Sequence, residues 1–459
     1  MTKKLWGGRF KKPTDGLLES FGTSLPFDRR LYRADIRAGI AHARVLREGG
    51  YLTARERDRI IAALKAVEAE ITEGRVGLEG GYEDIHSLVL GRLAEKEPEL
   101  AGKLHAGRSR NDLVVLDTRL YLREELEEIS SGVRALQSAL VGKGSEYPDL
   151  VIPGYTHLQP AQPVLAGHHL LAFVEMLQRD RGRLADAARR MDLLPAGSAA
   201  LAGSGLKLDQ KLMAELLGFK GVAPNSVDTV SDRDFVLEVL AALAICGTHL
   251  SRLASELVLW STAEFGFIEL DESFCTGSSF LPQKKNPDPA ELVRGKTGRL
   301  GGNLQAVLTA LHGLPLAYNR DLQEDKEPLF DSIDTVKSSL AVMAGVVATL
   351  KFNPPAVERA LRRGFLAAPD LAEHLVGRGV AFRQAHRAVG ELAVWVIEEE
   401  KEPAGITLED LRKFSPDFGP EALELLDPAA SVRAKKTIGS TNPGMVKRNL
   451  AKWRKKLEL

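Results

Sequence analysis

Four short segments of the 459-residue chain concentrate glycine, proline and polar residues between amphipathic stretches. The most basic is 276–288, where two hydroxyls, two lysines and a following helix start predict an electropositive loop. Such a loop can bind a dicarboxylate and can lower the pKa of a serine, which is otherwise a poor base. Gly277 would allow close backbone approach or a positive φ. The alternative is a flexible basic surface loop, although Phe280 and Leu281 argue against full exposure.

The second segment, 154–160, holds His157 next to Thr156 and ends at Pro160. A proline-bounded loop can present an imidazole rigidly, and imidazole can act as an acid or a base near neutral pH. The competing interpretation is a histidine that only satisfies loop carbonyls. By itself this segment favours the second interpretation.

The other two segments are less specific. In 105–112, two arginines, a serine and an asparagine suit a carboxylate or phosphate, and Arg110 is the candidate ligand. The same segment also fits a solvated helix start capped by Asn111 or Asp112. The segment 318–326 mixes both signs of charge densely, and by itself it indicates a solvated helix face.

Composition limits the class of protein. Lys plus Arg and Asp plus Glu both number 62, which argues against binding nucleic acid or anionic membrane by bulk charge. Hydrophobic residues make up 44%, a globular balance. Two cysteines cannot form a disulfide framework, and no Cys/His cluster shows zinc spacing. With no secretory signal or 18-residue apolar window, we expect a cytoplasmic protein without a membrane-spanning helix.

The elements that must position these segments are long helices. Prolines cluster at 148–163 and 282–289 and leave five long proline-free windows, at 99–147, 164–194, 225–281, 290–314 and 329–353. In three of them apolar residues step by four and three, the stripe of a helix packed in a bundle. The third window has room for ~30 helical residues. A mainly helical, all-α fold is therefore predicted.

Two helix starts carry capping signals. Ser231 followed by Asp234 resembles a capping box for the helix of the third window. Asp288, Pro289 and Glu291 give a stronger signal, with an N-cap acid, proline at the first helical position and glutamate at the third. The segment 276–288 should therefore be a loop that leads into a helix.

Segment 276–288 resembles the signature loop of the fumarase/aspartase superfamily, Gly-Ser-Ser-x-Met-Pro-x-Lys-x-Asn. Leu281 stands at the methionine position, which changes a packing residue and leaves the polar positions intact. Its continuation at 283–288 is similar to that of the argininosuccinate lyases. The same is true of 4–10, 107–112, 154–159 and 321–326, and fumarases and aspartases lack the tryptophan-bearing motif at 4–10. Five segments in order make this resemblance highly specific.

The resemblance implies roles for individual residues. The family's base serine falls on Ser278, its histidine on His157 and the acidic partner of that histidine on Glu291. Lys284 and Asn286 fall where the succinyl carboxylates are bound or the carbanion is stabilised. The family's further substrate contacts fall on Ser24, Asn111, Thr156, Tyr318, Gln323 and Lys326. Arg110 is added to them as the candidate ligand of segment 105–112.

The resemblance also implies an assembly and a reaction. Three domains are expected, at 1–111, 112–360 and 361–459, and the central one supplies five long helices to a twenty-helix core in a homotetramer with shared active sites. The implied reaction is the reversible elimination of arginine from argininosuccinate to leave fumarate, the last step of arginine biosynthesis, without metal or organic cofactor. The alternatives are another lyase of the superfamily, such as adenylosuccinate lyase, or a catalytically silent crystallin-like homologue.

Overall fold

The computed structural model describes residues 12–76 and 81–459. The described chain is mainly helical, as the sequence predicts, and its strands form only short two-stranded pairs. The tryptophan-bearing motif at 4–10 lies outside the described residues. The division into three domains stays a prediction, because the chain separates into two compact units that each combine distant segments.

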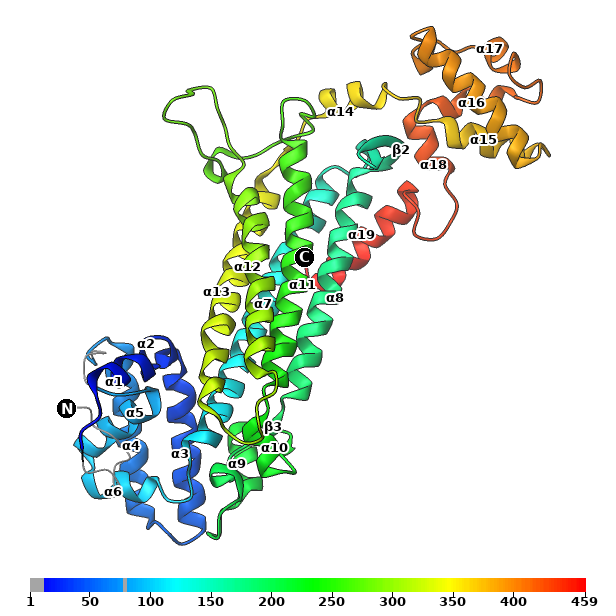
Figure 1. Cartoon of the computed structure of the whole chain (residues 1–459). Helices are drawn as coiled ribbons and strands as arrows, with labels where there is room; N and C mark the ends of the chain where they lie inside the picture. Colours follow the sequence, from blue (N-terminus) through cyan, green and yellow to red (C-terminus); the bar gives the residue numbers. More distant parts are fainter. Residues whose placement is uncertain (1–11, 77–80) are drawn as a thin grey trace. The chain divides into compact units, whose positions relative to one another are not determined.

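One long helix occupies each of the five windows (Figure 1). The third-window helix has 27 residues, close to the expected length. Two helices begin slightly before their windows because Pro289 and Pro328 lie in the first turn, where proline is tolerated. The five helices are α7 (Arg110–Glu146), α8 (Ala166–Arg190), α11 (Asp234–Trp260), α12 (Asp288–Leu311) and α13 (Lys326–Thr349).

The apolar stripes of three long helices are buried, which confirms the bundle pattern. No side chain in this set is more than 4% exposed. The stripes are Leu122, Leu126, Ile129, Val133, Leu136 and Leu140 on α7, Val236, Leu240, Leu243, Leu250, Ala254 and Leu257 on α11, and Val336, Leu340, Met343 and Val347 on α13 with Leu350 directly after it.

The first unit comprises 1–130, 182–245 and 299–336. Its core joins α3 to the start of α7 and to the 194–219 segment. The parallel pair of β3 (Leu193–Leu194) and β4 (Gly221–Val222) closes that segment. Its shorter helices are α1 (Gly16–Gly22), α2 (Leu25–Asp28), η1 (Arg29–Leu31), α3 (Tyr32–Glu48), α4 (Ala54–Thr72), α5 (Ile85–Lys96), α6 (Pro98–Leu104), η2 (Ala199–Leu201), α9 (Gln210–Leu217), α10 (Ser226–Ser231) and η4 (Arg320–Asp325).

The second unit comprises 131–181, 246–298 and 337–459. It contains two antiparallel pairs, β1 (Val151–Thr156) with β2 (Gln159–Leu165) and β5 (Ile268–Glu269) with β6 (Lys351–Phe352). A separate apolar cluster joins its helices between residues 365 and 426. Its shorter helices are η3 (Glu272–Phe274), α14 (Pro354–Leu361), α15 (Ala368–Gly377), α16 (Phe382–Glu398), η5 (Pro403–Gly405), α17 (Leu408–Arg412), η6 (Pro420–Ala422), η7 (Glu424–Leu426), α18 (Pro428–Ala434) and α19 (Pro443–Leu457).

Two local expectations are wrong. The proline-bounded loop around His157 is a β-hairpin in which Pro153 lies opposite Pro163. Prolines are tolerated there because both strands of a two-stranded sheet are edges. The expected Ser231 cap is replaced by Asp232, whose Oδ1 accepts the Asp234 N–H at 2.8 Å, while Ser231 itself ends α10.

In the described part of the chain, α11 alone is long and apolar enough to cross a membrane by length and composition. Half of its most apolar window is buried within the chain. The core helix of a bundle has the same composition, so the composition of α11 does not distinguish a membrane from a protein core.

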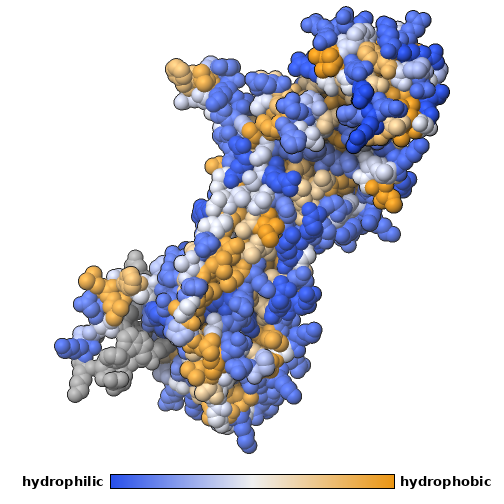
Figure 2. Space-filling model, turned by 45° about the vertical axis from the view of Figure 1, so that its right-hand side comes forward, coloured by the Kyte–Doolittle hydropathy of each residue, from blue (hydrophilic) through white to orange (hydrophobic). Residues whose placement is uncertain are grey.

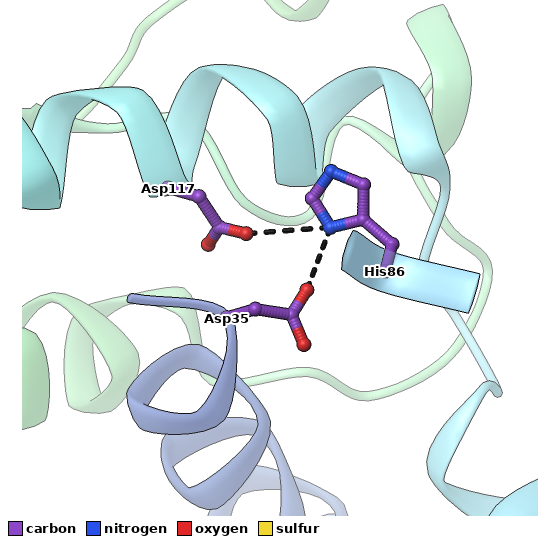
Figure 3. A group of neighbouring side chains, drawn as sticks. All are labelled: Asp35, His86 and Asp117. Atoms are coloured by element: carbon purple, nitrogen blue, oxygen red, sulfur yellow. Dashed lines mark hydrogen bonds and ion pairs between the residues drawn. The ribbon is translucent and has the colours of Figure 1, made fainter. Parts of the chain in front are cut away.

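A fully buried ionic cluster joins three helices of the first unit. The Nδ1–H of His86 on α5 donates to Asp35 Oδ2 on α3 at 2.6 Å, and Asp117 Oδ2 on α7 lies 3.3 Å from the same nitrogen (Figure 3). Although burial opposes the charged form, the Asp35 bond and the nearby carboxylates raise the pKa of His86 to about 9. The cluster therefore holds an imidazolium.

We predict that the stability of the fold declines as this imidazolium loses its proton. Its folded-state pKa, about 9, lies above the ordinary value of 6.5. The contribution is therefore complete below pH 6.5, falls as pH rises through 9, and amounts to at most about 3 kcal/mol. Thermal unfolding from pH 6 to 10 should show this decline in the wild type. His86→Gln should be less stable at pH 6 and lack the decline, whereas an equal decline in both proteins would contradict the assignment.

Candidate active site

Five of the residues predicted to bind substrate line one pocket in the first unit. They come from the start of α2, the start of α7, the segment before η4, η4 itself and the start of α13. No sequence pattern links these segments, and the packing of the first unit brings them together. The five are Ser24, Arg110, Tyr318, Gln323 and Lys326.

The Ser24 hydroxyl is held by a buried acid. It donates to Asp28 Oδ2 at 2.6 Å, and the Ile85 N–H donates to Asp28 Oδ1 at 3.1 Å. Burial raises the pKa of Asp28 to about 6, despite the opposing bond from Ser24. A carboxyl that changes charge close to neutral pH therefore lies on the pocket wall.

Arg110 is already engaged within the chain. Its guanidinium forms two parallel hydrogen bonds to Glu83, at 3.0 and 3.1 Å, and an ion pair with Asp84 at 2.8 Å. Arg320 donates to the same Glu83 carboxylate at 2.9 Å. Arg110 therefore shares its charge with two acids, so its predicted role as a substrate ligand would require it to contact the substrate while it remains in this network.

Lys326 is buried beside charged neighbours. Its ammonium donates to Asp325 at 2.7 Å, and Arg233 donates to the same carboxylate at 2.5 Å. Burial lowers the pKa of Lys326, and burial raises that of Tyr318. The pocket therefore combines a buried cation with a neutral phenol, groups that can bind a carboxylate.

The pocket has a volume of only about 20 Å³. That is room for roughly one water molecule, whereas small-molecule sites usually enclose about 300 Å³ or more. By themselves, these side chains enclose too little space for a small-molecule substrate. Asn111, at the second position of α7, is half-buried and is not among the residues of this pocket.

His157 and Thr156 lie at the end of the β1–β2 hairpin of the second unit. Thr156 pairs with Gln159, so His157 and Leu158 alone form the turn. Gly154 lies within β1, where a Cβ would crowd the opposite strand at 3.0 Å from the Gln162 carbonyl oxygen. Both Thr156 and His157 are exposed.

The loop that carries Ser278 is closed at its base. Thr276 and Asn286 exchange backbone hydrogen bonds of 3.2 and 2.8 Å, and α12 begins two residues later. Within this loop, Ser278 Oγ accepts the Phe280 N–H at 3.2 Å and the Leu281 N–H at 3.0 Å. Two donors aimed at one hydroxyl oxygen favour its deprotonated form. Gly277 has no positive φ, so that expected reason for glycine is wrong, while the close backbone approach of another group to it stays a prediction.

The two lysines of the loop differ. Lys285 pairs with Glu269 at 3.4 Å, whereas Lys284 is exposed and has no ion-pair partner in the part of the chain that the structure describes. The Asn286 side chain folds back to 3.5 Å from the Gly277 carbonyl. Glu291, in the first turn of α12, lies 3.8 Å from Arg294.

Within one chain, the predicted site residues of the pocket, the hairpin and the 276–288 loop lie in separate groups. The hairpin and the 276–288 loop lie apart within the second unit (Figure 1), and no hydrogen bond among the described residues joins His157 to Ser278 or Glu291. Sequence reasoning missed the acids that hold the pocket, Asp28, Glu83 and Asp84. The buried histidine beneath them, His86, was also missed. For Glu83, Asp84 and His86, the dense run of acids and histidine at 83–86 was the available signal in the sequence.

The cluster around His86 has the donor atoms of a metal site, one nitrogen and two carboxylate oxygens within 4.8 Å. A metal would need the Nδ1 lone pair, which the raised pKa of His86 keeps protonated. The groups therefore fit a buried ion cluster better than a metal centre.

Comparison with known proteins identifies the family. The lyase family model matches residues 8–302, and the argininosuccinate lyase C-terminal model matches 365–433. The argininosuccinate lyase of Symbiobacterium thermophilum is 51% identical over 98% of this chain and 97% of its own length. That of Pelobacter propionicus is 49% identical over 98% and 99%.

Solved structures agree in fold. EDDS lyase in complex with formate is 32% identical, with a TM-score of 0.85 over 94% of this chain and 87% of that one. The class II fumarase of Schistosoma mansoni, at 18% identity and a TM-score of 0.75 over 90% and 92%, shares the fold. The chain therefore belongs to the argininosuccinate lyase family of the fumarase/aspartase superfamily.

Proposed function

We propose that this protein is a cytoplasmic enzyme that reversibly eliminates arginine from argininosuccinate to leave fumarate, the last step of arginine biosynthesis. The assignment of Ser278 as the base is carried by its hydroxyl oxygen, which accepts two amide N–H groups in the same loop that holds the exposed Lys284. Relatives named argininosuccinate lyase at about half identity over nearly the whole chain support the substrate.

The reaction breaks a C–N bond β to a carboxylate. Ser278, as the alkoxide, takes the proton from the carbon next to that carboxylate, and the charge spreads into an aci-carboxylate dianion. Lys284 and the loop amides stabilise this dianion because fixed donors and cations act where the charge develops. The C–N bond then breaks, and His157 gives the departing nitrogen a proton directly or through water. Glu291 would favour the protonated imidazole if it paired with His157.

Assembly from several copies would complete the site. On α12 only Ala290, Val293, Leu300 and Val307 are buried, while Leu292 is 61% and Leu308 is 44% exposed. Hydrophobic patches interrupt the polar surface on the face in Figure 2. A bundle helix exposed on most of its surface needs covering helices. We infer a homotetramer in which the Asn111, His157 and Ser278 segments of each site come from three subunits.

We predict that fumarate appears when the protein is given argininosuccinate without added metal or nucleotide. Absorbance of fumarate measures the rate, with adenylosuccinate, malate and aspartate as comparison substrates. Faster turnover of adenylosuccinate would refute the assignment. Loss of activity with a chelator and recovery with a metal would refute the proposal that no cofactor is required.

Ser278→Ala should keep the fold and the tetramer and lose at least about 100-fold in kcat, the lower range of general-base effects. Ser279→Ala is the matched control, because its hydroxyl accepts no amide N–H among the described residues. Steady-state kinetics and size-exclusion chromatography check both variants. A larger loss of kcat in Ser279→Ala than in Ser278→Ala would show that Ser279 is the base.

Mixing tests the shared site. His157→Asn and Ser278→Ala chains, each inactive alone, should regain activity after joint unfolding and reassembly. A site works only if its histidine segment comes from a Ser278→Ala chain and its serine segment from a His157→Asn chain. Equal random mixing gives ½ × ½, so about one quarter of the sites in a symmetric closed tetramer should recover. Mixed tetramers as inactive as their parents would place both residues in one chain or remove one of them from catalysis.

A further inference from the structure

The turn that presents His157 adopts an unfavourable backbone. His157 has φ 54° and Leu158 has φ 56°, so both residues of the two-residue turn are left-handed. Hairpins use such turns because they match the twist of the strands, and they strongly prefer Asn-Gly. Histidine visits this region fairly readily, whereas leucine is strained there by its Cβ. A glycine at 158 would form the same turn without that strain.

The Leu158 side chain offsets none of this cost within its own chain, because it is 69% exposed. The strand that leads into the turn, in contrast, packs against aromatic side chains of the same unit. The Tyr155 ring lies 5.7 Å from the Phe265 ring and 6.4 Å from the buried Phe267 ring, centroid to centroid. The strained, exposed Leu158 therefore lies at the end of a packed hairpin, next to the proposed acid His157.

The loop that carries the proposed base, Ser278, also exposes large apolar side chains. Phe280 is 88% exposed and Leu281 is 39% exposed, and their N–H groups are the two that bind Ser278 Oγ. If His157 and Ser278 act on one substrate, Leu158 and Phe280 both border that site, because their Cα atoms lie within about 4 and 7 Å of those of His157 and Ser278. Burying both would remove two large apolar groups from water.

We propose that Leu158 of one subunit packs against Phe280 of a second copy of this chain, and that this contact fixes His157 over the substrate and excludes water. The inference rests on the proposed function for its catalytic consequence. The occupant is the same chain, because one chain holds its hairpin and its loop apart and both apolar groups are exposed. Leu158 is thus a positioning residue.

The contact itself can be tested without activity. In a Cys275→Ser background, which removes the less buried native cysteine, Leu158→Cys and Phe280→Cys are combined and treated with a short bis-maleimide. A covalent dimer on a denaturing gel is expected from the pair and not from either single cysteine. Leu158→Cys with Leu17→Cys is the control for random collision, because Leu17 is 81% exposed on α1. A dimer yield no higher than in this control would overturn the contact.

Kinetics test the positioning role. Leu158→Gly should lower kcat at least tenfold with KM changed less than threefold and with no fall in melting temperature, since glycine suits the turn. Leu158→Met should restore most of kcat. Glu400→Gly is the backbone control, because Glu400 is also left-handed, at φ 47°, and exposed. It should leave kcat unchanged.

Phe280→Ala completes a double-mutant cycle. Combined with Leu158→Gly, it should lower kcat little further than the worse single change, because the two side chains form one contact. Multiplicative losses, or a kcat within twofold of wild type in Leu158→Gly, would overturn the positioning role. A wild type that releases no fumarate would instead overturn the proposed function, and the crosslinking result would still decide the contact.

Discussion

The structure depends on the burial of one apolar stripe along each long helix. On α7, α11 and α13 these stripes are almost wholly removed from water within one chain. On α12 most of the surface remains exposed, although a helix of 24 residues in a bundle would ordinarily be covered. The same physical requirement that stabilises the subunit therefore favours further helices packed against α12. The proposed homotetramer would supply them.

The residues predicted to bind or act on the substrate lie where these long helices begin or end. Arg110 and Asn111 open α7, the His157 hairpin leads into α8, the Ser278 loop leads into α12, and Lys326 opens α13. A helix end is a rigid support, and the segment next to it can adopt conformations that a helix forbids. Both the left-handed turn at His157 and the folded loop around Ser278 use this freedom. Rigid helices thus flank the short segments that hold the predicted catalytic residues.

Buried charge sets the electrostatics of the pocket wall. Glu83 holds Arg110 and Arg320, Asp28 holds Ser24, and the His86 cluster lies behind them. Removing these groups from water is costly, and breaking a pair would leave an uncompensated charge. Such a network is weak evidence for stability. It does hold Ser24 and Arg110, which are predicted to contact the substrate, in fixed positions, as preorganised catalysis requires.

The helical class, the five long helices and the loop before Asp288 could all be predicted from the sequence, because periodicity and proline placement are local properties of the chain. The sequence also identified the lyase family through five polar segments in order. Only the tertiary structure decided that residues 151–165 form a hairpin, since two proline-rich edge strands leave no alternating pattern. Tertiary structure also gathered Ser24, Arg110, Tyr318, Gln323 and Lys326 around one pocket, together with Asp28 and His86, and paired Glu83 with Arg110. Those contacts join residues up to hundreds of positions apart, and no local pattern encodes such distances.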